Sequence, residues 1–79
     1  MNGAEFLKSK CITQADLARE LNCARNNVNI WFCGSHSPKV STLVKITAAL
    51  NKLGAKTNYN EVYKVLKKSR EEYLEKKRG

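Results

Sequence analysis

The sequence has little of what enzymes and membrane proteins depend on. It contains one histidine, and no nucleophile stands in a recognisable arrangement with a base and a carboxylate. Its four glycines form no phosphate-cradling loop. No segment approaches the roughly 20 apolar residues of a membrane-spanning helix. We therefore expect a binding protein that is not an enzyme and needs no cofactor.

The cysteines do not suggest a disulfide framework. Cys11, Cys23 and Cys33 are odd in number, and the N-terminus lacks the apolar run of a signal peptide. We expect a cytoplasmic protein with free thiols. Cys33 and His36 have the C-x-x-H spacing of half a zinc site, but the other half would have to come from Cys11 and Cys23. We expect no metal site.

Acidic residues are also few compared with basic ones. Lysine and arginine total 15 against 7 acids, which gives a net charge of +8. This excess favours a polyanionic partner, first of all nucleic acid, although a lysine-rich soluble surface would give the same charge. The 79 residues suffice for one domain, residues 1–79. A domain this small buries a modest core, so a partner or a second copy would add stability.

The apolar spacing predicts an all-α protein, with helices near residues 4–10, 14–21, 24–32, 40–50 and 59–75. Thr13 and Asp16 form a capping-box pattern at the start of the second helix. Asn22 and Gly34 tolerate the left-handed conformation that ends many helices, so we place the ends of the second and third helices there. No strand pattern or internal repeat is visible.

The third predicted helix has two unlike sides. At about 100° per residue, one side contains Ala24, Val28, Trp31 and Phe32, and the opposite side contains Asn26, Asn29, Ile30 and Cys33, with Arg25 and Asn27 flanking both. Arginine pairs with guanine and asparagine with adenine, so this side is suited to reading DNA bases. A solvated polar face is the alternative. Ile30 would meet a thymine methyl group or, with Cys33, belong to a protein interface.

The last predicted helix changes character after its midpoint. Beyond Lys67 it is mostly charged, and such a segment is a solvated helix, an electrostatic arm for DNA, or half of a helical dimer seam. We expect the apolar residues of a dimer seam to be Tyr63, Leu66, Tyr73 and Leu74.

The middle of the chain resembles a known DNA-binding family. The pattern comprises Thr13-Gln14, Leu17-Ala18, Leu21, Val28, Trp31, Gly34, Pro38 and the stretch 43–50. It is similar to the helix-turn-helix of phage Cro proteins and lambda-type repressors, also called XRE-like, and covers about half of the chain. The resemblance implies a compact five-helix domain with an extended C-terminal helix, in which residues 13–33 form the motif and the third helix enters the major groove.

The resemblance also implies roles for individual residues. Gln14 matches a phosphate contact, and Asn27 matches a position near the DNA backbone. The base-reading positions fall on Arg25, Asn26 and Asn29, and the loop that approaches the opposite strand contains Ser35, Ser37 and Lys39. The chain departs from the family pattern at Asn22, at Ala24, which lacks a capping hydroxyl, and at the apolar Ile30, Phe32 and Cys33.

These observations predict a sequence-specific regulator that binds double-stranded DNA as a homodimer. We expect a repressor of phage, prophage or plasmid type in the cytoplasm of a bacterial or phage-infected cell. The alternative is a protein-binding use of the same domain, as in antitoxins or anti-CRISPR proteins, through Ile30 and Cys33.

Overall fold

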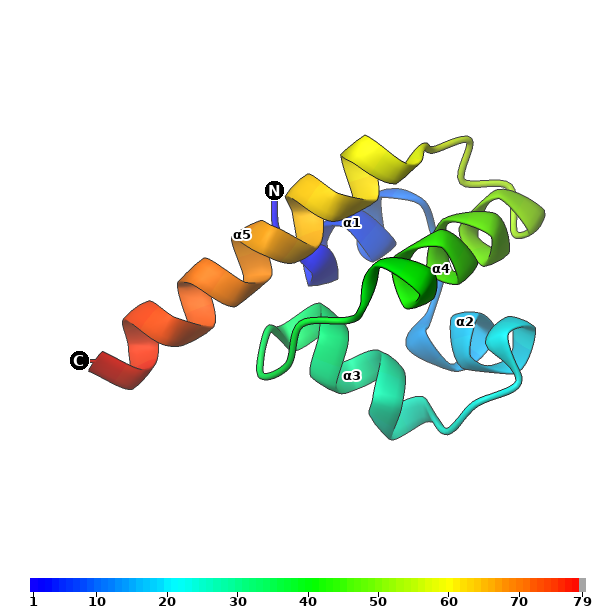
Figure 1. Cartoon of the computed structure of the whole chain (residues 1–79). Coiled ribbons are helices and arrows are strands. Elements are labelled where there is room, and N and C mark those ends of the chain that lie inside the picture. The colour runs from blue at the N-terminus through cyan, green and yellow to red at the C-terminus, as the bar shows by residue number, and fades with distance from the viewer. Residues whose placement is uncertain (79) are drawn as a thin grey trace.

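The chain is built from five helices, as the computed structural model shows for residues 1–78 (Figure 1). They are α1 (Gly3–Ser9), α2 (Gln14–Leu21), α3 (Arg25–Cys33), α4 (Val40–Lys52) and α5 (Tyr59–Arg78). No strand occurs in these residues, so the all-α prediction is confirmed. Gly79, the last residue of the predicted domain, lies outside the described residues.

Local capping signals fix where the helices begin. The Thr13 hydroxyl accepts from the Asp16 amide at 3.0 Å, and the Asp16 carboxylate accepts from the Thr13 amide at 3.3 Å, so the predicted capping box is present. The Asn58 side chain accepts from the Glu61 amide at 2.9 Å at the start of α5. A second capping box, formed by Asn2 and Glu5 at α1, was not predicted.

The helix ends partly differ from the prediction. Asn22 (φ 54°) and Gly34 (φ 94°) are both left-handed, as expected. Two helices are longer than predicted, since α4 continues to Lys52 and α5 to Arg78. Basic residues fill the last turn of α5, where they complement the negative end of the helix dipole and favour its continuation.

One apolar core joins all five helices. Its largest fully buried side chains are Phe32, Leu17, Ile46, Leu50, Val28 and Val62. Trp31 is only half-buried and packs at the edge of this core. Leu66 lies in the core, 5% exposed, so its predicted place in a dimer seam is wrong.

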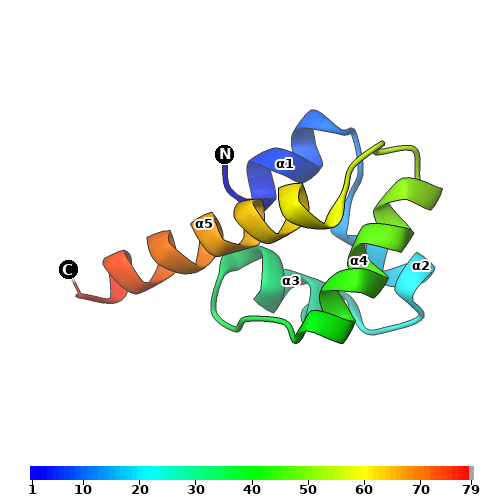
Figure 2. The same cartoon turned by 45° about the horizontal axis from the view of Figure 1, so that its top comes forward.

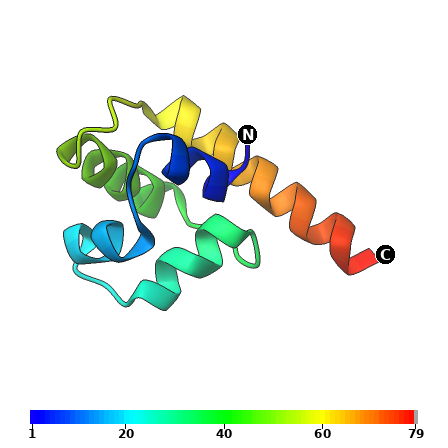
Figure 3. The same ribbon diagram turned by 180° about the vertical axis from the view of Figure 1, so that it is seen from behind.

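Helix α5 is the element that ties the domain together. It packs against α1, α3 and α4, whereas α2 packs against α3 and α4 (Figure 2). Its C-terminal half projects beyond the other helices in every view, which gives the molecule extents of 37 × 23 × 22 Å (Figures 1 and 3). Within residues 1–78, none of the helices has the length and apolarity needed to span a membrane.

Candidate nucleic-acid interface

A short turn fixes α3 relative to α2. Residues 22–24 join the two helices, and the left-handed Asn22 lets the Cys23 amide donate to the Ala18 carbonyl at 3.0 Å. Leu17 of α2 and Val28 of α3 are fully buried beneath this turn. The buried contact leaves the opposite side of α3 facing solvent.

The outward side of α3 is polar and its side chains are unengaged. Arg25, Asn26, Asn27 and Asn29 are all exposed. Among residues 1–78 none of these four side chains forms a hydrogen bond or an ion pair with the protein. Their donors and acceptors are therefore available to an external partner without breaking an internal contact.

Four of the residues singled out in the sequence come together in space. Gln14, Arg25, Asn26 and Asn29 line one shallow hollow where the start of α2 meets the start of α3. Asn27 is exposed on the flank of α3 but is absent from this lining. The hollow combines one guanidinium and three carboxamides, a set that can both donate and accept hydrogen bonds.

The apolar end of α3 is only partly open to solvent. Ile30 is half-buried, and the chain after α3 folds back onto its backbone carbonyl. The Ile30 carbonyl accepts from the His36 amide at 3.2 Å and from the Ser35 hydroxyl at 3.3 Å. Cys33 is exposed, and its thiol lies 3.6 Å from the Ser35 hydroxyl. Of the two residues considered for a protein interface, Cys33 is therefore open to solvent and Ile30 is partly covered.

The loop between α3 and α4 is held by a residue that the sequence did not reveal. Arg70 of α5 donates from Nη1 to the carbonyl oxygens of Gly34 at 2.9 Å and Ser35 at 2.7 Å. Ser37 and Lys39, farther along the loop, are exposed. The guanidinium thus satisfies carbonyls at the C-terminal end of α3 and fixes the direction in which the loop leaves it.

The helices on either side of this loop begin without a side-chain cap. Ala24 precedes α3 and Lys39 precedes α4, and neither side chain accepts a hydrogen bond from its helix. First-turn amides lacking an internal acceptor are suited to binding anions. At α2, by contrast, the Asp16 carboxylate occupies part of the helix start.

The capping box at α2 lowers the pKa of Asp16. The hydrogen bond from the Thr13 side chain is the main cause that lowers the pKa of the Asp16 carboxyl below its ordinary value, followed by the backbone hydrogen bond to Thr13. Arg19, 3.8 Å away, lowers the pKa further. The carboxylate is therefore ionised at neutral pH and is already engaged within the capping box.

Carboxylates are absent from a long stretch that includes this region. Residues 21–60, which contain α3, the loop and α4, include no aspartate or glutamate. Their basic residues are Arg25, Lys39, Lys45, Lys52 and Lys56. The segment that presents the exposed asparagines and the uncapped helix starts is thus positively charged throughout, which favours polyanions.

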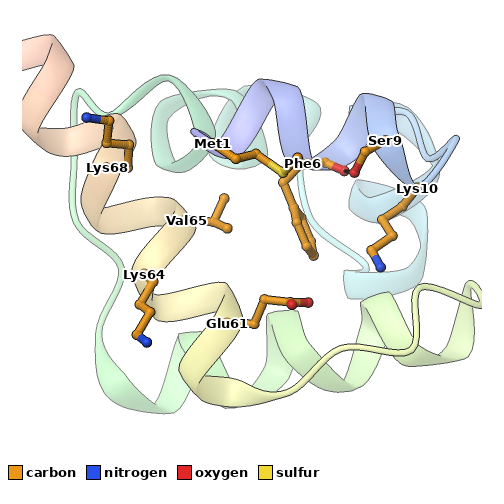
Figure 4. Close-up of a pocket in the computed structure, with 8 residues that line it drawn as sticks. All are labelled: Met1, Phe6, Ser9, Lys10, Glu61, Lys64, Val65 and Lys68. Atoms are coloured by element: carbon orange, nitrogen blue, oxygen red, sulfur yellow. Dashed lines mark hydrogen bonds between the residues drawn. The ribbon is translucent and has the colours of Figure 1, made fainter.

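A larger hollow lies elsewhere. It has a volume of about 520 Å³ and lies between α1 and α5, with Lys10 after α1 and Lys64 and Lys68 of α5 around it (Figure 4). Its floor residues Phe6 and Val65 are already buried, and the Lys10 ammonium lies 5.6 Å from the centre of the Phe6 ring. The hollow thus exposes little apolar surface to a ligand.

No cluster suited to metal binding occurs in the part of the chain that the structure describes, where three or more His, Cys, Asp or Glu side chains never converge. Cys33 ends α3 and His36 lies in the loop after it, whereas Cys11 follows α1 and Cys23 lies in the turn after α2.

Comparisons of the chain with protein-family models, curated proteins and solved structures gave no match.

Proposed function

We propose that the protein is a sequence-specific regulator of transcription that binds double-stranded DNA through α2 and α3. In this proposal the two helices and the turn between them are a helix-turn-helix of the Cro and lambda-repressor type. The observation that carries the proposal is the shared hollow of Gln14, Arg25, Asn26 and Asn29, where exposed polar groups project from two helices whose buried sides are fixed.

The chemistry of this surface matches the major groove. With α3 in the groove, Arg25 would pair with the O6 and N7 atoms of guanine, and Asn26 and Asn29 would pair with adenine. Gln14, at the first position of α2, would contact a phosphate through its side-chain amide. Asn27 would lie near the DNA backbone. Base contacts would supply specificity, and phosphate contacts would fix the register of the protein on the duplex.

The loop after α3 would contact the opposite phosphate strand. Ser37 and Lys39 are exposed there, and Lys39 immediately precedes the uncapped start of α4. Ser35 would act through its backbone, since its hydroxyl donates to the Ile30 carbonyl. The absence of carboxylates from residues 21–60 leaves no acidic side chain in this segment to repel phosphate.

We further propose that the protein binds as a homodimer and represses transcription by covering a promoter. Two copies on a pseudo-palindromic site would double the small contact area of one α3 helix. Tyr73 and Leu74, on the projecting half of α5, remain available for the seam. Glutamates and lysines surround them, so two such helices can pair opposite charges. A bacterial cytoplasm or a phage-infected cell remains the proposed setting.

Selection of bound duplexes from a random DNA pool tests the proposal. We expect one enriched, approximately palindromic motif, and an affinity that falls steeply with salt as counterions are released from the phosphates. The Arg25→Ala variant, selected in parallel, is the matched control and should lose preference at one base position in each half-site. Recovery of no motif by the wild-type protein would contradict the proposal and favour a protein-binding role.

A further inference from the structure

The face shared by α4 and α5 carries apolar side chains that the core does not use. Val40 is 67% exposed, Val44 is 55% exposed and Tyr63 is 47% exposed. Val40 and Val44 lie four residues apart on α4 and therefore share a side of that helix. Leu43, between them, lines a hollow together with Tyr63 of α5. We call Val40, Val44 and Tyr63 the α4–α5 patch.

The hollow beside the patch is small and has mixed walls. Its volume is about 110 Å³, and its apolar walls are Pro38, Leu43, Tyr63 and Leu66. The polar residues that line it are Ser37, Lys67 and Arg70. Its size suits a single apolar side chain rather than a free ligand, since small-molecule sites are usually about 300–1,000 Å³. An anchor side chain in a pocket of this kind is typical of a protein interface.

The charge around the patch is of one sign. The lining contributes Lys67 and Arg70 and no carboxylate, and Lys39 directly precedes α4. The loop and α4 lie within residues 21–60, which contain no acid. An occupant of the hollow must therefore come close to Lys67 and Arg70, and no carboxylate lines the hollow to offset their charge.

These charges argue against a second copy of the chain as the occupant. A symmetric dimer through the patch would place it against itself, so lysines would face lysines. Like charges brought together at an interface disfavour association and reject such partners. DNA offers the opposite charge, but a duplex has no large apolar side chain to fill the hollow or to cover two exposed valines.

We propose that the α4–α5 patch binds an acidic segment of another protein, which inserts one aliphatic or aromatic side chain into the hollow beside Tyr63. Flanking aspartates or glutamates of that segment pair with Lys39 and Lys67. Arg70 keeps its hydrogen bonds to the carbonyls of Gly34 and Ser35, so it attracts the acidic segment through its positive charge without pairing with it directly. The inference does not depend on the proposed base reading by α3, because Ser37 and Lys39 are the only residues that it shares with the proposed DNA contacts.

A random peptide library displayed on phage provides the probe. The wild-type protein and the Val44→Glu variant are used as separate baits, with Ala48→Glu as the matched control. Ala48 is exposed on the same helix but lines a different hollow with Glu20 and Leu21 of α2. Both substitutions add one negative charge at an exposed site, so circular dichroism should show two folded proteins.

We expect peptides enriched on the wild-type protein to carry several acids around one large apolar residue. They should bind Ala48→Glu as well as wild type and Val44→Glu about tenfold more weakly, because the variant repels the acids and removes apolar contact. Amide NMR shifts on titration with the strongest peptide should concentrate at Val40, Val44 and Tyr63.

Other outcomes would overturn the inference. Enriched peptides without acids, or binding that Val44→Glu does not weaken, would exclude an acidic occupant of this patch. Sedimentation of the wild-type protein as a dimer that Val44→Glu dissociates would assign the patch to a second copy. Weaker duplex DNA binding by Val44→Glu than by Ala48→Glu would assign it to DNA.

Discussion

Gly34 lies directly against the backbone of Ser69. A Cβ atom added at Gly34 would stand 2.2 Å from the Ser69 carbonyl oxygen, a distance that no real side chain adopts. The end of α3 therefore packs directly on the middle of α5, because Gly34 has no side chain. We expect a change in this contact to move the loop that follows α3.

Replacing this glycine should be costly for two separate reasons. Gly34→Ala combines left-handed strain with a backbone clash and should lower the free energy of unfolding by about 3 kcal/mol. Gly54→Ala is the control, since Gly54 is also left-handed (φ 90°) but would place its Cβ in open space. It should cost about 1 kcal/mol. Urea denaturation measures both values, and equal losses would show that the contact with Ser69 is absent.

Arg70 should control the order of the loop. Arg70→Gln removes a charged donor from the Gly34 and Ser35 carbonyls, at a cost of about 1.5–3 kcal/mol. We expect faster amide hydrogen exchange at residues 34–37 and weaker binding to operator and scrambled DNA alike. Lys67→Gln makes the same charge change one turn away and should leave exchange in the loop unchanged. If both variants exchange alike, charge rather than the hydrogen bonds governs the loop.

The capping box of α2 should make stability depend on pH. Because the folded state lowers the pKa of Asp16, its contribution is present above the ordinary carboxyl pKa of about 4 and is lost as the pH falls through the lower folded value. Asp16→Asn should thus reduce the free energy of unfolding at pH 7. Near pH 2 the difference in this free energy between the variant and the wild type should become smaller. Thr13→Ala should cost about 1 kcal/mol at neutral pH. If the urea midpoints of Asp16→Asn and the wild type differ equally at pH 7 and pH 2, the stability of the capping box does not depend on the titration of Asp16.

Substitutions of Arg25 and of Lys39 should weaken DNA binding in different ways. Arg25→Ala should cost about 1–3 kcal/mol on the selected operator and little on scrambled DNA, because a base contact is lost. Lys39→Ala should weaken both complexes and reduce the slope of affinity against salt by about one charge. Competition binding at two salt concentrations separates the two patterns. If Arg25→Ala weakens binding to operator and to scrambled DNA equally, Arg25 does not read a base.

The projecting half of α5 should carry the self-association seam. Leu74 is 40% exposed, so Leu74→Glu should leave thermal stability within about 0.5 kcal/mol of wild type. The variant should bind operator DNA as a monomer in analytical ultracentrifugation. Asn60→Glu, an equal charge change at the other end of α5, should still form the dimer. Deleting all residues after Lys68 would not test the seam alone, because it also removes Ser69 and Arg70 and their contacts with α1 and with the loop after α3.

The helices were predictable because their signals are local. The Thr13–Asp16 pair, the left-handed Asn22 and the 3.6-residue apolar period act within one or two turns, and the structure contains each of them. The same period placed Asn26 and Asn29 on one side of the third helix with Arg25 beside them, whereas Gln14 was singled out by the family resemblance alone. Helix lengths were less certain, because charged residues such as Lys76 and Lys77 continue a helix without any apolar pattern.

The remaining features depend on contacts between distant residues. Arg70 reaches carbonyls 35 and 36 positions away, and nothing in its neighbourhood distinguishes it from the exposed basic residues of α5. The half-burial of Ile30 arises because Ser35 and His36 fold back onto its carbonyl, a path that a helical wheel does not represent. The exposure of Val40 and Val44 likewise follows from where α5 crosses α4.

The contact between the first and last helices has a consequence for synthesis of the chain. The Gly3 amide donates to the Ser69 hydroxyl at 2.6 Å in a buried site, 66 residues apart, and Asn2 bonds Glu72 at 2.8 Å. A nascent chain emerging from the ribosome can therefore pack its first helix only against α3 until most of α5 has been translated. Until then α1 and the end of α3 leave apolar surface open, so folding of the domain waits for the translation of α5.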